Sequence, residues 1–445
     1  MDLNTPAGHG PTERPEPESD AEPTTRGRRL VLMGQGYVGL PVAMQAVARG
    51  YSVVGFDPDE ARVKRLNAGE SYVEDVPDGV LQQALASGRY RATTQERDCA
   101  GFDVAVITVP TPLREGVPDL SYIEASARTL GRYLRPGATV VLESTTYPGT
   151  TEELVKPVLE EMSGLVGGPD FHLGYSPERI DPGNPTWGFV NTPKVVSGID
   201  AASLAKVDGF YASLVDRTVP VAGPKEAELT KLLENTFRHV NVALVNELAM
   251  FADDLGIDVW SAIDAATTKP FGYMRFTPGP GVGGHCLPID PSYLSWRVRR
   301  SLGHTFRFVE LANDVNDHMP DYVVRRLTYG LNRRRKPLNG SRVLLLGLAY
   351  KRNTSDSRES PALVVAERLI GLGADVRAVD THVALGVLPP GIELVSLTAD
   401  ELRASDVAVM LTDHADFDLD LVVAHAPYVL DTRRVLPAAD HVEYL

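Results

Sequence analysis

The chain has 445 residues, and at about 150 residues per domain this length predicts two or three domains. Its formal net charge of −15 argues against general nucleic-acid binding, because phosphate backbones are held by a surplus of lysine and arginine. Two cysteines exclude a disulfide framework, and no apolar run is long enough to span a membrane, so we expect a cytoplasmic protein without a membrane partner.

The N-terminal stretch differs in composition from the rest of the chain. It is rich in proline, glutamate, threonine and glycine and has almost no apolar periodicity. Such a segment cannot bury enough apolar surface to fold, so we expect a disordered tail over 1–27.

A glycine-rich turn follows, in the order strand, turn, helix and strand. A buried strand at Arg29–Met33 leads into Gly34-Gln35-Gly36-Tyr37-Val38-Gly39 and a helix at 40–49, and a strand at Ser52–Phe56 ends at Asp57. This G-x-G-x-x-G pattern predicts a dinucleotide site, because the glycines allow the tight turn, the approach of the pyrophosphate and close helix packing. Asp57 would accept hydrogen bonds from ribose hydroxyls and repel a 2′-phosphate, which favours NAD over NADP. The alternative is a turn that only packs a helix on a sheet.

The alternation continues and predicts a parallel, doubly wound sheet. Strands are expected at 104–109 and 139–143, and helices at Ser121–Tyr133 and 150–160. Ligands bind such sheets at the carboxyl ends of strands, where Val109-Pro110-Thr111-Pro112 and Glu143-Ser144-Thr145-Thr146 lie. Taken alone, each stretch is also typical of a simple turn.

A turn-rich segment at 174–184 brings Glu178, Arg179 and Asp181 together. A surface charge cluster is the usual explanation for such a run. The alternative explanation is that a carboxylate of this segment belongs to a functional site.

A long helix is predicted over 225–256, where apolar residues recur at helical spacing. Lys231 and Asn235 share one of its faces, either as a solvated stripe or as part of a site. A helix of this length needs a partner surface for its apolar face, so we expect a homodimer or a larger homo-oligomer. Further helices are expected at 293–301 and 317–331.

The loop 279–291 is crowded with glycines and carries a cysteine. Asp290-Pro291 is typical of a helix N-cap followed by proline at the first helical position. A helix N-terminus would favour the thiolate of Cys286, which is the reactive form. The alternative is a small buried hydrophobe in a tight turn, and we expect the other cysteine, Cys99, to be structural.

After the basic stretch 333–337 the alternating pattern restarts, which predicts a second doubly wound domain. Strands are expected at Arg342–Leu346, 375–380, 406–411 and 428–430, with a helix at 361–372. Because G-x-G-x-x-G is missing, this domain need not hold a second dinucleotide. Its loop offers Lys351, Arg352 and Arg358, which suit phosphate or nucleotide recognition but also fit a solvated basic loop.

The predicted class is therefore α/β, with two doubly wound Rossmann-like domains joined by a helical central region with one long helix. The expected segments are the tail 1–27, an NAD-binding domain 28–215, a central helical dimerisation and catalytic domain 216–335, and a nucleotide-sugar-binding domain 336–445.

Together these stretches resemble the nucleotide-sugar 6-dehydrogenases, the family of UDP-glucose and UDP-N-acetylhexosamine dehydrogenases, over roughly residues 28–436. The glycine loop is similar to the family's G-x-G-G-x-C-x-P-x-D signature, and Lys231 and Asn235 match a lysine and an asparagine of its central helix. Further matches are Ser144-Thr145, Pro177-Glu178, Gly347-Leu348-Ala349-Tyr350-Lys351, Arg358-Glu359-Ser360 and Asp431-Thr432-Arg433.

The resemblance implies a four-electron oxidation of a sugar C6 alcohol to a carboxylate with two NAD+. Asp290 would hold a water-mediated base, while Lys231 and Asn235 would stabilise developing negative charge. Cys286 would attack the aldehyde, so that a thioester forms and is then hydrolysed by water that Glu178 activates. The catalytic residues that the resemblance assigns are Cys286, Lys231, Asn235, Asp290, Glu178 and Thr145.

Binding residues follow from the dinucleotide pattern, the strand ends and the resemblance. For NAD they are Gly34, Gly36, Tyr37, Val38, Gly39, Asp57, Arg62, Val109, Thr111, Pro112, Ser144, Thr146 and Arg358. For the nucleotide sugar they are Arg179, Gly281, Gly283, Gly284, Tyr350, Lys351 and Arg433. We expect no metal site.

The substrate is less sharply indicated than the reaction. The segment 177–184, Gly279-Pro280-Gly281 and His285 are similar to the branch that acts on N-acetylhexosamines, while glucose, and thymidine in place of uridine, stay open. Two other interpretations are a single-step 3-hydroxyacid-type NAD dehydrogenase, which would not need Cys286, and a non-catalytic NAD-binding sensor.

Overall fold

The computed structural model describes residues 27–114, 116–181, 184, 186–284, 287, 289–383 and 388–445. The predicted tail therefore lies outside the described residues except for Gly27, and so does Cys286. The described residues form two compact units. The N-terminal unit comprises 27–234 and Ser292–His304, and the C-terminal unit comprises Asn235–Pro291 and Thr305–Leu445.

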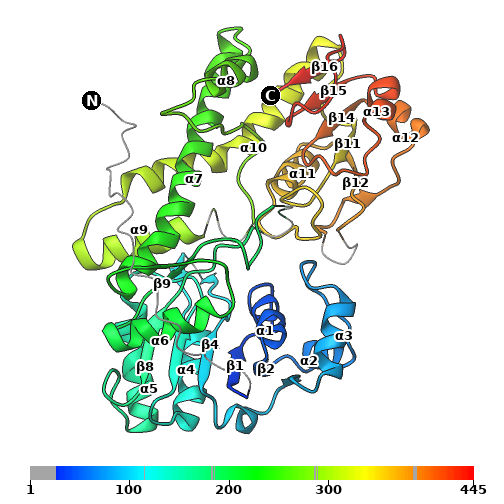
Figure 1. The fold of residues 1–445 in the computed structure, drawn as a ribbon. Coiled ribbons are helices and arrows are strands. Elements are labelled where there is room, and N and C mark those ends of the chain that lie inside the picture. Colours follow the sequence, from blue (N-terminus) through cyan, green and yellow to red (C-terminus); the bar gives the residue numbers. More distant parts are fainter. Residues whose placement is uncertain are drawn as a thin grey trace. The chain divides into compact units, whose positions relative to one another are not determined.

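The N-terminal unit is built on a six-stranded parallel sheet of strand order β3-β2-β1-β4-β7-β8 (Figure 1). The strands are β1 (Arg29–Met33), β2 (Ser52–Phe56), β3 (Tyr90–Thr93), β4 (Val104–Ile107), β7 (Thr139–Leu142) and β8 (His172–Tyr175). The order reverses between β1 and β4, and the register brings Met33 beside Phe56 on one side and Ile107 on the other. This reversal marks the edge at which open parallel sheets bind ligands.

Alternation along the strands divides the core of this unit between the two faces of the sheet. Leu30 and Leu32 face the layer that contains α1 and α6, whereas Val31 and Met33 face α4 and α5. The helices of this unit are α1 (Gly39–Ala48), α2 (Glu60–Asn67), α3 (Asp78–Ala86), α4 (Ser121–Tyr133), α5 (Lys156–Ser163) and α6 (Ala201–Ala212). Two short strand pairs complete it, β5 (Leu113–Arg114) with β6 (Val117–Pro118), and β9 (Lys194–Val196) with β10 (Thr218–Pro220).

The C-terminal unit contains a second six-stranded parallel sheet, of order β13-β12-β11-β14-β15-β16. Its strands are β11 (Arg342–Leu346), β12 (Asp375–Val379), β13 (Glu393–Leu394), β14 (Val407–Met410), β15 (Val429–Asp431) and β16 (Val442–Tyr444). One face packs on α10 (Arg307–Arg333) and α11 (Pro361–Gly371), and the other on α12 (Ala399–Ala404) and α13 (Leu419–His425). The order repeats that of the first sheet, which confirms the α/β class with two doubly wound domains.

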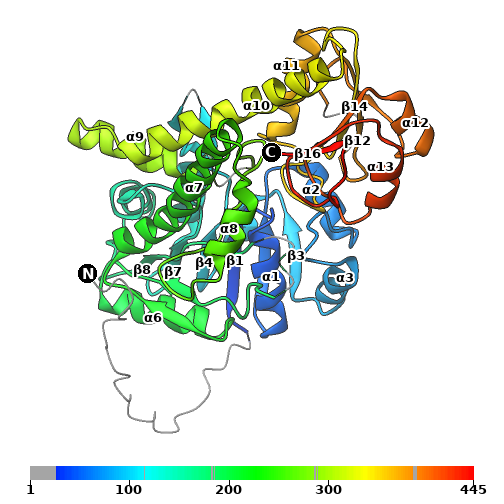
Figure 2. The same cartoon turned by 90° about the horizontal axis from the view of Figure 1, so that it is seen from above.

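Three more helices complete the chain. They are α7 (Pro224–Asp254), α8 (Val259–Thr267) and α9 (Asp290–Leu302). Figure 2 shows α7 as one unbroken helix, as predicted, and both α7 and α9 contribute residues to both units. None of the helices in the described ranges combines the length and the apolar character that crossing a bilayer requires.

Two predicted helices differ from the structure. The helix expected at 150–160 is a π-helical turn, Thr151–Val155, that continues into α5. The helix expected at 317–331 begins at Arg307, because its first turns bury only scattered residues such as Val309 and Ala312 and so show little periodicity.

Candidate functional site

The turn after β1 supplies the framework of a dinucleotide site. Gly34 has a φ of +94°, and a Cβ there would lie 2.9 Å from the Thr108 carbonyl oxygen. A Cβ at Gly39 would collide with the Gly34 carbonyl oxygen. A Cβ at Gly36, in contrast, would meet no atom within 4 Å. The fold itself requires Gly34 and Gly39, whereas Gly36 leaves open space where a pyrophosphate can approach the backbone, so this turn fits NAD.

Asp57 at the end of β2 is buried and pins this turn. Its Oδ2 accepts a hydrogen bond from the backbone N–H of Gln35 at 3.0 Å and pairs with Arg62 Nη1 at 3.0 Å. Its Oδ1 accepts from the N–H of Asp59 at 3.1 Å. The predicted ribose acceptor and Arg62 are therefore one preassembled pair. Tyr37, two residues beyond Gln35, is exposed.

The loops after β4 and β7 are tied to each other. The hydroxyl of Ser144 donates to the Val109 carbonyl at 2.7 Å, and the hydroxyl of Thr111 donates to the Thr145 carbonyl at 2.8 Å. The hydroxyl of Thr146 shares a 2.6 Å hydrogen bond with that of Thr150. The structure thus brings the predicted strand-end residues of these two loops together, while the side chain of Thr145 stays partly exposed.

Glu178 lies after β8 and is nine-tenths buried, at 8% exposure. Its Oε1 accepts from the backbone N–H groups of Arg179 at 2.7 Å and Ile180 at 2.5 Å. The guanidinium of Arg179 pairs with Glu234 at 2.7 Å and donates to the Pro193 carbonyl at 2.6 Å. A surface charge cluster is therefore the wrong interpretation for Glu178.

A buried charged cluster surrounds Glu178, and sequence reasoning did not predict it. Lys194, the first residue of β9, forms an ion pair with Glu143, and Tyr211 of α6 donates to Glu143 Oε2 at 2.6 Å. Burial raises the pKa of Glu143 to about 7 although Lys194 lowers it. Burial is the largest single effect on Glu178 and opposes its ionisation, but attraction to Lys194, the hydrogen bond with Glu143 and the N–H of Ile180 together outweigh it and lower the pKa of Glu178. The only sequence signal was a lysine and a glutamate within otherwise apolar strand segments.

Lys231 and Asn235 are both buried on α7, so the solvated-stripe interpretation is wrong. The side-chain amide of Asn235 donates to Asp290 Oδ2 at 2.6 Å within the C-terminal unit. Asp290 is 3% exposed. It is the first residue of α9, so the helix begins one residue earlier than the sequence predicted with Asp290 as its N-cap. Two predicted catalytic groups, far apart in sequence, are thus in direct contact.

The glycine loop packs against the second doubly wound domain. A Cβ at Gly283 would lie 2.6 Å from the Glu359 carbonyl oxygen, and one at Gly284, whose φ is +82°, would lie 2.6 Å from the Tyr350 ring. Gly281 has a φ of +133°. Glycine is required at these positions by the chain's own packing, and this packing brings Tyr350 to the loop.

The first residue of the loop is held by a chain of buried polar groups. The N–H of Gly279 donates to Asn246 Oδ1 at 3.0 Å, and the amide of Asn246 donates to Asn316 Oδ1 at 2.9 Å. A Cβ at Gly279 would lie 2.9 Å from Arg433 Nη1, and Arg433 Nε donates to the Leu411 carbonyl at 2.7 Å. Arg433 and the loop are therefore neighbours.

Residues at the ends of the second sheet are engaged with each other. Asp380, after β12, accepts from the backbone N–H groups of Leu348 at 2.7 Å and Ala349 at 3.0 Å. Arg358, assigned to NAD from the sequence, lies in this unit and pairs with Asp356 at 2.7 Å. Lys351, in the same loop, is partly buried.

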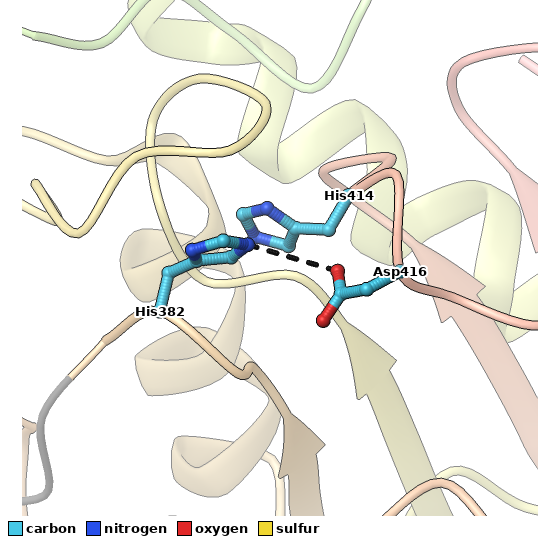
Figure 3. Close-up of side chains that lie close together, drawn as sticks. All are labelled: His382, His414 and Asp416. Atoms are coloured by element: carbon cyan, nitrogen blue, oxygen red, sulfur yellow. Dashed lines mark ion pairs between the residues drawn. The ribbon is translucent and has the colours of Figure 1, made fainter.

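Figure 3 shows His382, His414 and Asp416 converging on this edge, with ligand atoms within 4.8 Å of one another. Both ring nitrogens of His414 are already engaged, because Nδ1 accepts from the Asn353 N–H at 3.0 Å and Nε2 bonds Asp380 at 3.1 Å. His382 Nε2 lies 3.6 Å from Asp416 Oδ1. These contacts account for the cluster as a link between the loops after β12 and β14, and we assign it no metal.

Comparisons with known proteins place these features in a family context. Models of the UDP-glucose/GDP-mannose dehydrogenase family match residues 28–215 (NAD binding domain), 225–318 (central domain) and 344–438 (UDP binding domain). A UDP-N-acetyl-D-mannosamine dehydrogenase of Pyrococcus horikoshii is 35% identical over 390 residues, which cover 87% of this chain and 90% of the relative. A UDP-N-acetyl-D-glucosamine 6-dehydrogenase of Pseudomonas aeruginosa is 34% identical over 423 residues, with coverages of 94% and 96%. A solved structure of a UDP-D-ManNAc dehydrogenase from Pyrococcus horikoshii is similar with a TM-score of 0.85 and 32% identity, covering 94% of this chain and 98% of that one.

Proposed function

Because this chain belongs to the UDP-glucose/GDP-mannose dehydrogenase family and is an NAD-dependent oxidoreductase, we propose that it oxidises the C6 hydroxyl of a nucleoside-diphosphate sugar to a carboxylate. Similarity to dehydrogenases named for UDP-N-acetylmannosamine and UDP-N-acetylglucosamine supports a UDP-N-acetylhexosamine as substrate. The product would be the corresponding uronic acid.

The observation that carries this proposal is the 2.6 Å hydrogen bond from the Asn235 amide to the Asp290 carboxylate. Both groups are buried, and Asp290 opens the helix that follows the cysteine-bearing loop. A buried carboxylate with a fixed partner can take up a proton through a water molecule as the alcohol is oxidised. Lys231, one turn earlier on α7, would stabilise the negative charge that develops on the sugar oxygen.

NAD+ would supply the hydride acceptor for both oxidations. The turn at Gly34–Gly39 would hold its pyrophosphate and the Asp57–Arg62 pair its ribose, with the tied loops after β4 and β7 beside them. The chain's own residues then have to bind and orient the sugar, move protons and provide a nucleophile.

The second oxidation needs a covalent step, because an aldehyde must become tetrahedral before it can give up a hydride. The Cys286 thiolate would add to the aldehyde carbon and form a thiohemiacetal, which loses its hydride to become a thioester. Cys286 lies outside the described residues, so its role rests on the sequence motif.

Hydrolysis of the thioester would use the Glu178 carboxylate as general base, with Thr145 beside the water. Water adds to the thioester carbonyl as Glu178 takes its proton, and the thiol leaves with the carboxylic acid as product. The backbone N–H groups that hold Glu178 fix its orientation for this task.

The sugar nucleotide would bind where the glycine loop meets Tyr350 and Arg433, with Lys351 and Arg179 as further contacts. We propose the segments 28–215, 216–335 and 336–445 for NAD binding, catalysis and assembly, and nucleotide binding, respectively. A cytoplasmic location and a homo-oligomeric state stay predictions.

The test counts NADH formed per sugar consumed by the purified protein with UDP-N-acetylmannosamine, UDP-N-acetylglucosamine, UDP-glucose and TDP-glucose. We expect two NADH per sugar with one of them, and at most one with Cys286→Ser. One NADH per sugar for the wild type, with full activity of Cys286→Ser, would favour a single-step dehydrogenase. No NADH with any substrate would favour a non-catalytic NAD-binding protein.

A further inference from the structure

The buried cluster around Glu143 contains charged groups that the proposed reaction does not use. Glu143 follows β7, Lys194 opens β9, Tyr211 lies in α6 and Glu178 follows β8. Glu143 and Tyr211 are fully buried, and Lys194 is 3% exposed. Ionised groups at this depth lose most of their hydration, so the cluster has to satisfy them internally.

Lys194 has three N–H donors, and three acceptors surround it. It pairs with Glu143, donates to the Pro177 carbonyl at 3.1 Å and lies 3.5 Å from Glu178 Oε2. Tyr211 holds the other oxygen of Glu143 at 2.6 Å. The ammonium is thus anchored on one side by Glu143 and directed on the other toward Glu178.

The cluster also has an unbalanced charge. Two carboxylates share one buried ammonium, and Lys231 of α7 adds a weaker attraction for Glu178. The remaining groups that face Glu178 are the N–H groups of its own loop and Tyr211. Because the pKa of Glu143 is raised to about 7, Glu143 still holds its proton where Glu178 ionises, and the charge of Lys194 then acts mainly on Glu178.

We propose that Lys194, anchored by Glu143 and Tyr211, is a positioning residue that keeps the Glu178 carboxylate ionised and oriented. The inference rests on the proposed function, in which Glu178 is the base for thioester hydrolysis. Lys194 touches no reacting atom in this role and acts through Glu178 alone.

Two substitutions separate the effect of Lys194 on Glu178 from that of Glu143. Lys194→Met removes the cation, so Glu178 needs a higher pH to ionise and the acidic limb of the kcat–pH profile moves to higher pH by about one pH unit. Glu143→Gln replaces a carboxyl group that is itself protonated where Glu178 ionises, because the pKa of Glu143 is raised to about 7, so the limb should stay close to that of the wild type.

Glu143→Gln keeps the shape of the side chain and leaves one cation with one carboxylate, so this variant is expected to fold even if Lys194→Met does not. Glu161→Gln is the matched control, since Glu161 is an exposed carboxylate of the same unit that pairs with Arg128 at 3.6 Å, and its profile should match the wild type. Lys194→Arg, which keeps the charge, should restore most of the wild-type profile. An acidic limb that does not move in a folded Lys194→Met protein, or one that moves to higher pH by a full unit in Glu143→Gln, would overturn the proposal.

An infrared titration of the protonated carboxyl band separates this proposal from the proposed function. Wild type should lose two buried carboxyl protons, from Glu143 and Glu228, as the pH rises through about 7, and Glu143→Gln should lose only one. This readout needs no substrate, so it tests the cluster even if no sugar is oxidised. A wild type that oxidises a nucleotide sugar, together with a Glu143→Gln protein that loses as many buried carboxyl protons as the wild type, would leave the function standing and refute the role of the cluster.

Discussion

Asp290 is the residue whose contact with Asn235 carries the functional proposal, and its negative charge can be tested separately from its shape. Asp290→Asn keeps an oxygen that can accept from Asn235, but it removes the carboxylate that would relay a proton. We expect kcat to fall about a hundredfold or more, with little change in the thermal midpoint.

NADH formation with the preferred sugar measures this effect. Asp314→Asn is the control, because Asp314 is an exposed aspartate of the C-terminal unit, at 69% side-chain exposure, and its substitution should leave kcat unchanged. An Asp290→Asn enzyme as fast as wild type would remove Asp290 from the mechanism.

Gly284 shows how closely the loop is packed. Gly284→Ala would combine a strained φ of +82° with a clash against the Tyr350 ring, whereas Gly340→Ala meets a similar φ of +79° with no atom within 4 Å. We expect about 1 kcal/mol of destabilisation for Gly340→Ala and about 2–4 kcal/mol for Gly284→Ala. Urea unfolding of both variants measures the difference. Equal losses of unfolding free energy would show that the Tyr350 ring moves aside at no cost.

At the scale of elements, Glu228 joins α7 to the π-helical turn before α5. Its carboxylate accepts from the N–H of Gly149 at 2.5 Å and from the N–H of Thr151 at 2.9 Å. Burial nevertheless raises the pKa of Glu228 to about 7. The folded protein therefore holds a proton on Glu228 at pH values where the unfolded chain has lost it.

This difference gives a pH dependence of stability with a definite sign. The contribution of Glu228 is largest below pH 4.5, the ordinary pKa of the group, and falls as the pH rises to about 7. Relative to Glu228→Gln, the wild type should lose up to about 3 kcal/mol of unfolding free energy between pH 5 and 8. Glu226→Gln, an exposed neighbour on the same helix, should show no such slope in urea titrations at several pH values. A difference in unfolding free energy between Glu228→Gln and the wild type that stays constant from pH 5 to 8 would contradict the prediction.

Elements were predictable where burial was continuous or strictly periodic. β1, β2 and β11 have the expected bounds because each is a run of buried apolar residues between polar turns. β3 and β8 were missed because each has four residues and carries polar or small side chains. The start of α10 was missed because exposed Phe308 and Leu311 obscure its periodicity.

The site was predictable where a motif is local and unpredictable where contacts are long-range. The glycine turn and the pair on α7 lie within a few residues, so spacing indicates their geometry. Lys194 lies 51 residues from Glu143 and 16 from Glu178, so no periodicity links them. Their meeting depends on the adjacency of β7 and β8 in the six-stranded sheet, and on the backbone hydrogen bonds by which Ser197 and Ile199, after β9, join β8.

At the scale of the whole molecule, α7 exposes an apolar stripe that a second copy of the chain could cover. The exposed members on the helix are Leu229, Leu233, Phe237, Leu244, Leu248 and Phe251, and exposed Leu255 follows directly after its last residue. Exposed apolar faces of this length are typical of subunit contacts, which supports the predicted homodimer.

Leu248→Glu places a charge in the middle of the stripe and should weaken self-association about a hundredfold or more. Leu372→Glu changes a similarly exposed leucine after α11, at 51% exposure against 46% for Leu248, and should have no effect. Sedimentation velocity over a range of concentrations measures the association. A wild type that is monomeric and active at all concentrations would contradict the predicted assembly.

The unbroken course of α7 has a thermodynamic consequence for catalysis. Lys231 and Asn235 are separated by one turn, a rise of about 6 Å that helix geometry alone sets. Their relative position therefore persists through any rearrangement of the surrounding domains that leaves the helix intact. In the proposed mechanism the backbone positions of Lys231 and Asn235 are therefore preorganised before each turnover, so fixing them relative to each other adds no entropic cost to the activation barrier.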